Sequence, residues 1–98
     1  MIIIKFIDNV EHKYNSFKKI LKLYNYNDII YINCCNINLS RLPKLPNTLK
    51  VLWCYNNKIS RLPNLPNSLI QLHCESNNLS SLPKLPDSLE ELYCWSNN

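Results

Sequence analysis

The five cysteines are the side chains of this sequence with the most possible chemical roles, because a thiol can bind a metal, form a disulfide or act as a nucleophile. Four of them are spaced by twenty residues, at Cys34, Cys54, Cys74 and Cys94. This spacing lacks the short C-x-x-C pairs of a zinc site. A free cysteine also packs as a small apolar side chain, so we expect all four to lie in a buried core and to resist alkylation.

Cys35 and the two histidines are the other candidates for catalysis. Cys35 is out of phase with the periodic cysteines, so we expect an outward-facing surface thiol that an alkylating agent can reach. A reactive thiol is the alternative, but no neighbouring histidine or cation is assured. His12 and His73 fall on different predicted elements, and no Ser-His-Asp, HExxH or glycine-rich phosphate motif occurs. We therefore predict a protein that is not an enzyme, with no catalytic residue, no metal and no cofactor.

The periodic cysteines belong to a repeat of twenty residues. The pentapeptide Leu-Pro-x-Leu-Pro occurs three times, at 42–46, 62–66 and 82–86. Each copy precedes the pattern Leu-x-x-Leu-x-Cys-x-x-Asn, and a degenerate upstream copy has Ile37 in place of the asparagine. Self-similarity at a fixed period of this length is typical of stacked repeats. Residues 29–98 are therefore expected to form leucine-rich repeats, of which one is degenerate, two are complete and one is truncated.

Each repeat should contribute one short strand. Leu52 and Cys54 alternate with Val51, Trp53 and Tyr55, which is the period of a strand with one buried face. We expect four parallel strands, centred on 32–34, 52–54, 72–74 and 92–94. The paired prolines disfavour helix in the return segments, so the opposite, convex side should be extended or polyproline-like.

Polar residues at fixed positions of the repeat should satisfy the backbone where the chain turns. Asn57, Asn77 and Asn97 fall just after the strands, where their amides could form a ladder that pairs buried backbone groups. Asn or Asp followed by Ser or Thr comes after the second proline of each unit, at 47–48, 67–68 and 87–88. We expect these pairs to make side-chain-to-backbone turn bonds.

Residues 1–28 precede the repeats and are expected to cap them. Residues 2–7 have the pattern of a short strand. Apolar residues then recur at helical spacing, at Val10, Tyr14, Phe17, Leu21 and Tyr24. Asp8 and Glu11 resemble a capping box, which predicts an amphipathic helix over the first repeat. The predicted fold class is thus an α/β solenoid, with a short parallel sheet of leucine-rich repeats, an extended convex side and an N-terminal strand and helix cap.

Composition excludes several classes of partner. The formal net charge is +4, but the only local cluster is Lys18, Lys19 and Lys22, which is too small for a nucleic-acid arm. The apolar start at 1–4 is interrupted by Lys5, well short of a secretory or membrane-spanning segment. We expect a cytoplasmic protein that binds neither nucleic acid nor a membrane.

The unit Leu-Pro-x-Leu-Pro-x-Ser-Leu-x-x-Leu-x-Cys-x-x-Asn-x-Leu, as at 62–79, resembles the bacterial-type leucine-rich repeats of secreted Yersinia and Shigella effectors. It is also similar to uncharacterised repeat proteins of giant viruses, whose usage is similarly rich in Asn, Ile and Lys; such a protein would act in the host cytoplasm. The resemblance covers 42–98 well and 29–41 loosely. It implies a binding scaffold, because the ligase domain that accompanies the Shigella-type repeats has no counterpart in this sequence.

The outward strand positions are the candidate partner-binding surface, because a small exposed sheet does not need so many large aromatic side chains for solubility. The predicted binding residues are Tyr31, Trp53, Tyr55, His73, Glu75, Tyr93 and Trp95. Cross-strand packing that only stabilises the sheet is the alternative.

The leading hypothesis is a protein–protein interaction scaffold that binds an unidentified protein through this concave face. A truncated or remnant repeat protein is one alternative, because the repeats stop at Asn98 without a polar cap. A structural subunit that self-associates through the C-terminal coil is the other.

Overall fold

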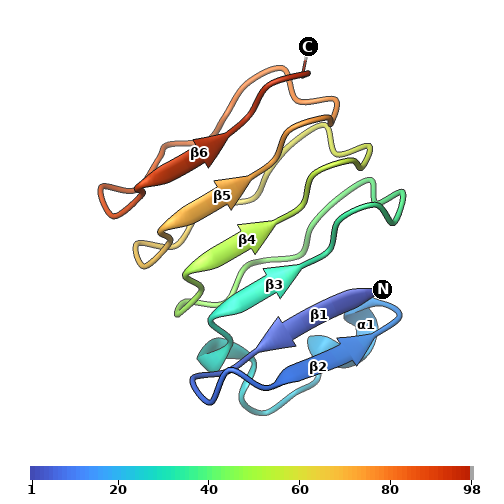
Figure 1. Cartoon of the computed structure of the whole chain (residues 1–98), viewed down its shortest axis with the longest axis vertical. Coiled ribbons are helices and arrows are strands. Elements are labelled where there is room, and N and C mark those ends of the chain that lie inside the picture. The colour runs from blue at the N-terminus through green and yellow to red at the C-terminus, as the bar shows by residue number, and fades with distance from the viewer. Residues whose placement is uncertain (98) are drawn as a thin grey trace.

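A six-stranded mixed sheet is the main element of the computed structural model, which describes residues 1–97 (Figure 1). The strands lie in the order β2-β1-β3-β4-β5-β6. Their bounds are Ile2–Lys5 for β1, Glu11–Tyr14 for β2, Tyr31–Asn33 for β3, Val51–Trp53 for β4, Gln71–His73 for β5 and Glu91–Tyr93 for β6. Helix is limited to α1, Phe17–Ile20, and the 3-10 turn η1, Tyr26–Asp28.

The four predicted repeat strands are β3 to β6, and each pairs in parallel with the next. Residues twenty apart are direct partners, so Ile32, Leu52, Leu72 and Leu92 form one row across the sheet. This register follows from the period of the sequence, because a slip by one residue would turn every apolar side chain toward solvent. The parallel-sheet prediction is therefore confirmed for β3 to β6, whereas the complete sheet is mixed.

The segments that return from one strand to the next contain no helix, as the prolines predict. Each ends in a tight turn, in which the amides of Leu49, Leu69 and Leu89 donate to the proline carbonyl three residues earlier. The hydroxyl within each turn bonds the neighbouring unit: Ser68 Oγ donates to the Leu49 carbonyl at 2.6 Å, and Ser88 Oγ to that of Leu69 at 2.7 Å. The expected turn bonds of Ser and Thr thus connect adjacent repeats.

The N-terminal helix prediction is wrong. Residues 2–14 form a β-hairpin, and β1 pairs antiparallel with both β2 and β3, so the hairpin extends the sheet. Of the expected helix, only the single turn α1 is present. The Asp8 side chain does not cap a helix; its Oδ1 accepts a hydrogen bond from the amide of Val10 at 3.1 Å, within the hairpin turn. Tyr24, placed on the expected apolar stripe, is 99% exposed.

One continuous core lies behind the sheet, and it contains the inward leucine and isoleucine side chains of β1 and β3 to β5. Cys34, Cys54 and Cys74 are fully buried in this core, as predicted. Cys94 is exposed, so its predicted burial is wrong. The cause is its place on β6, the last strand of the sheet, because no strand among residues 1–97 stacks beyond it (Figure 1).

The predicted asparagine ladder is present. Asn57 Nδ2 donates to the carbonyls of Cys34 and Cys54, at 2.9 and 3.0 Å, while its Oδ1 accepts from the amide of Leu39 at 2.8 Å. Asn77 and Asn97 make the equivalent bonds one and two units further along. Each asparagine therefore bridges two units through backbone groups that burial would otherwise leave unpaired.

One position in every unit has a left-handed backbone. The residues are Asn36, Asn56, Ser76 and Ser96, with φ between 55° and 59°. Glycine is the usual residue for this conformation, but the chain contains none. Asparagine tolerates it better than serine does, so this position carries more backbone strain at Ser76 and Ser96 than at Asn36 and Asn56. No helix among residues 1–97 is long and apolar enough to cross a membrane.

Candidate binding face

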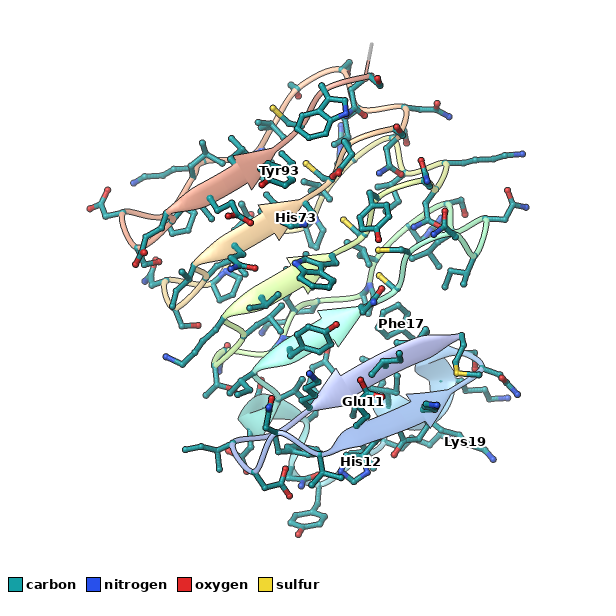
Figure 2. The ribbon with its side chains drawn as sticks, viewed as in Figure 1. Glu11, His12, Phe17, Lys19, His73 and Tyr93 are labelled. Atoms are coloured by element: carbon teal, nitrogen blue, oxygen red, sulfur yellow. The ribbon has the colours of Figure 1, made fainter. Side chains whose placement is uncertain are left out.

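Five aromatic rings form a continuous stack across the outward face of β3 to β6. We call Tyr31, Trp53, His73, Tyr93 and Trp95 the aromatic stack. It exists because the strand register places Trp53, His73 and Tyr93 side by side on β4, β5 and β6. Figure 2 shows His73 and Tyr93 together on this face.

The stack has an edge contact at one end, parallel contacts in its middle and a tilted contact at the other end. Tyr31 meets Trp53 edge to face at 5.4 Å between ring centroids. The Trp53 and His73 rings are 5.3 Å apart with planes inclined by only 5°, and the His73 and Tyr93 centroids are 4.2 Å apart at 16°. Trp95 lies tilted against Tyr93 at 5.0 Å. Such arrangements stabilise the folded protein beyond the area they bury.

Polar groups hold three of the rings in place. His73 Nε2 lies 2.5 Å from Glu91 Oε2 on the next strand. Trp53 Nε1 donates to Gln71 Oε1 at 3.4 Å, and the Lys5 ammonium lies 4.4 Å above the Tyr31 ring in a cation–π contact. The rings are therefore fixed both by stacking and by partners at their edges.

Exposure increases along the stack toward β6. The His73 side chain is only 12% exposed, whereas Tyr93 is 36% and Trp95 is 58% exposed. A large aromatic side chain at such exposure is not needed for packing within residues 1–97. The most accessible apolar surface of this face is therefore at its β6 end.

A second column, Cys35, Tyr55, Glu75 and Trp95, follows the strands. Burial raises the pKa of the Cys35 thiol to about 11, and Cys35 is only partly exposed. The pKa of Tyr55 is also raised, first by the charge of the neighbouring Cys35 thiolate. This thiol is therefore a weak nucleophile near neutral pH, so we expect Cys35 to be alkylated more slowly than its outward position alone predicts.

Glu75 is the other notable member of this column. One of its carboxylate oxygens, Oε1, is buried and has no hydrogen-bond partner among residues 1–97. A buried acceptor without a donor destabilises the folded protein. A cation or hydrogen-bond donor placed beside this oxygen would therefore be bound favourably. Across β4 to β6, the outward positions carry Glu75 and Glu91 and no lysine or arginine.

All seven predicted binding residues lie on this face. Tyr31, Trp53, His73, Tyr93 and Trp95 touch one another in sequence, while Tyr55 and Glu75 lie in the adjacent column. Sequence reasoning missed Lys5, because the pairing of β1 with β3 that brings it to Tyr31 was not predicted. The alternation of Ile2 and Ile4 with Lys5 was the available signal, since it places Lys5 on the outward face.

The face combines planar aromatic rings with two carboxylate side chains, Glu75 and Glu91. Within residues 1–97, no group of three or more His, Cys, Asp or Glu side chains could hold a metal ion. The face offers planar rings, a hydrogen-bonded histidine–glutamate pair and one unpaired carboxylate oxygen. No protein-family model matches the chain, and no curated protein is significantly similar to it.

Proposed function

We propose that this chain is a leucine-rich-repeat solenoid that acts without catalysis, as a scaffold that binds a partner protein through the aromatic stack. The twenty-residue register of β3 to β6 and the asparagine ladder support the repeat assignment. The resemblance to bacterial-type leucine-rich repeats supports the role as a scaffold, although a fold alone does not define an activity.

The observation that carries the proposal is the exposure of Trp95 at the end of an otherwise ordered stack. Packing alone accounts for Trp53 and His73, which lie between other rings. It does not account for a tryptophan that is 58% exposed beside a tyrosine that is 36% exposed. Tryptophan and tyrosine are enriched at binding hot spots, where burial by a partner supplies the free energy.

The carboxylates of the face indicate the chemistry of the partner. Glu75 and Glu91 lie among the aromatic rings of β4 to β6, and the outward positions there include no basic residue. A partner segment that presents arginine or lysine beside an apolar side chain complements both features. The chain itself carries a net charge of +4, so its overall charge would not attract a basic partner; the local carboxylates would have to do so.

Site-specific crosslinking tests the proposal. A photoreactive phenylalanine analogue at Trp95 should yield a discrete adduct with a protein from lysate, and the same analogue at Tyr24 should not. Tyr24 is the matched control, because it is a 99% exposed aromatic residue away from the strand face. The purified partner should then lose about tenfold or more in affinity for Trp95→Ser and keep its affinity for Tyr24→Ser. Equal adducts from both positions, or equal affinities, would contradict the proposal.

Self-association through β6 is a second candidate, and a different observation favours it. β6 pairs only with β5 among residues 1–97, Leu85 in the return segment before it is 37% exposed, and Cys94 is also exposed. An unpaired strand edge next to apolar side chains is a template for another strand. Sedimentation at increasing concentration should show a dimer that Leu85→Glu abolishes. A chain that stays monomeric at high concentration would exclude this candidate and leave the first one intact.

A further inference from the structure

Two arginines occupy equivalent positions of adjacent repeats. Arg41 and Arg61 lie in the tetrapeptide Ser-Arg-Leu-Pro, at 40–43 and 60–63. The amide of Lys58 donates to the carbonyl of Leu39 at 2.8 Å, which joins the two segments just before the arginines. Both arginine side chains are exposed, and they leave the backbone on neighbouring segments. This region is separate from the aromatic stack, because it belongs to the return segments and not to the strands.

A surface notch of about 620 Å³ lies at these arginines. Its lining residues are Ser40, Arg41, Leu42, Ser60, Arg61, Leu62 and Pro63. Leu42 and Leu62 are buried core residues, so the floor of the notch is held by the packing of the repeats. The volume is within the range of small-molecule sites.

The donors of this notch have no partner in the protein. Neither guanidinium forms an ion pair or a side-chain hydrogen bond within residues 1–97. The backbone amides of Ser40, Arg41, Ser60 and Arg61 likewise donate to no acceptor in that part of the chain. The two positive charges on adjacent segments repel each other. An anion between them attracts both guanidinium groups and so offsets this repulsion. Guanidinium groups also bind tetrahedral oxyanions through paired hydrogen bonds.

An apolar pocket of about 390 Å³ adjoins the notch and shares Arg41 and Leu42 with it. Phe17, Ile37 and Leu39 contribute its apolar lining. A ligand that fills both spaces therefore combines a doubly charged oxyanion with an apolar body.

We propose that the Arg41–Arg61 notch binds a phosphate monoester, with the phosphoryl oxygens between the two guanidinium groups and the apolar substituent toward Leu39. The proposal does not depend on the partner-binding role of the aromatic stack. The third repeat supplies a natural comparison, because Ser81 stands where Arg41 and Arg61 stand in the units before it.

Titrations with inorganic phosphate and with phenyl phosphate test this assignment. Backbone amide chemical shifts are measured by NMR at each step, at constant ionic strength. Both probes should shift the amides of residues 40, 41, 60 and 61, and phenyl phosphate should also shift residues 37 and 39. Arg61→Ser should weaken binding of either probe by about tenfold, since one charge-assisted pair is lost. Lys84→Ser is the matched control, because it removes an equal charge from an exposed site in the third repeat and should leave the affinity unchanged.

Ser81→Arg tests the proposal through an increase in phosphate affinity. Unlike a loss of binding, such an increase cannot result from a variant that fails to fold. This substitution places a third arginine at the position equivalent to Arg41 and Arg61, one unit further along, and should increase the affinity for inorganic phosphate. A phosphotyrosine peptide that binds more tightly than phenyl phosphate would identify a phosphorylated protein as the source of the group, and equal binding would identify a small molecule. Equal weakening by Arg61→Ser and Lys84→Ser, or no gain in Ser81→Arg, would overturn the proposal, because the attraction would then come from net charge alone.

Discussion

The imidazole of His73 lies face to face with the phenol ring of Tyr93, with centroids 4.2 Å apart, while its Nε2 lies 2.5 Å from Glu91 Oε2. Trp53 covers the other face of the same imidazole. One side chain therefore joins the rings of three strands and one carboxylate. The order of the whole aromatic stack depends on this central residue.

Replacing the central ring should separate the stack into two parts. His73→Ala removes both parallel contacts, so we expect a loss of about 1–2 kcal/mol in the free energy of unfolding and a reduced near-ultraviolet circular dichroism signal. Tyr24→Ala removes an exposed ring without neighbours in the stack and should change neither quantity. Urea unfolding provides the free energies. An unchanged near-ultraviolet spectrum for His73→Ala would show that the stack is ordered without it.

Thiol labelling should divide the five cysteines by burial. Cys94 is exposed and should react fastest with iodoacetamide near pH 8, whereas Cys34, Cys54 and Cys74 should react only after unfolding. Cys35 should react slowly, because its pKa is about 11. Mass spectrometry of digested samples, with and without urea, gives the order. Labelling of Cys35 at the rate of Cys94 would refute the assignment of a weakly acidic thiol.

Alkaline pH should destabilise the fold through the buried thiols. Burial raises the pKa of Cys34 from 9.0 to about 12. The unfolded chain therefore loses this proton first, so the contribution to stability is complete below pH 9 and falls as the pH rises from 9 to about 12. Within this window each such thiol should cost about 1.4 kcal/mol per pH unit. The urea midpoint should fall between pH 8 and pH 10.5, and it should fall less in Cys34→Ala, which lacks one of these groups. An identical pH dependence in that variant would contradict the linkage.

The asparagine ladder should contribute most to stability where its members are buried, at Asn57 and Asn77. Asn57→Ala leaves buried carbonyls and amides without partners, so we expect a loss of about 3 kcal/mol in the free energy of unfolding. Asn97→Ala should cost less, since one of the carbonyls it contacts belongs to the exposed Cys94. Asn78→Ala, at an exposed position, should be neutral. Similar losses for Asn57 and Asn78 would show that burial does not set the cost.

A single substitution should relieve backbone strain. Ser76 has φ of 56°, a conformation that Asn56 occupies in the preceding unit with φ of 55°. Ser76→Asn should raise the free energy of unfolding by about 0.5–1 kcal/mol, because asparagine tolerates the left-handed region better. Ser80→Asn introduces the same side chain at an exposed position with ordinary backbone geometry and should have no effect. A destabilised Ser76→Asn would mean that the serine side chain has a role of its own.

The sequence allowed the repeat strands to be located closely, because three signals agreed there. The twenty-residue period, the alternation of Leu52 and Cys54 with outward residues, and the prolines of the return segments each predict the same arrangement. The register then placed Trp53 beside His73 and Tyr93 without further information. Which rings stack in parallel depends on side-chain torsions, and strand periodicity does not determine these.

In the N-terminal segment the strand predicted at 2–7 is present as β1, but the helix after it was predicted wrongly, because the signals there are ambiguous over a short length. Val10, Tyr14 and Phe17 fit a helical period, but His12 and Tyr14 fit the alternation of a short strand equally well. Asp8 is suited to a helix cap and to a hairpin turn by the same side-chain chemistry. The pairing of β1 with β3 decided between them, and it is a long-range contact that no local pattern reports.

The prediction for Cys94 failed for a related reason. Strand alternation places Cys94 on the inward side, as it does the other periodic cysteines. Burial also requires a neighbouring strand on both sides, and within residues 1–97 β6 has only β5 as a neighbour. Periodicity identifies which face a side chain occupies. It does not report how many neighbouring strands cover that face.

Hydrogen bonds between units have a consequence for how such a chain can change in length. Ser68 and Ser88 reach back nineteen residues, and Asn57 and Asn77 reach back twenty-three, so each unit offers its neighbour the same set of donors and acceptors. Removing or duplicating twenty residues in phase therefore joins matching surfaces and leaves no donor without an acceptor. An insertion of any other length keeps the later rungs aligned only where a return segment takes up the extra residues as a loop. We therefore expect in-phase loss or gain of a whole twenty-residue unit, the product of unequal crossing-over between copies, to disturb the fold least.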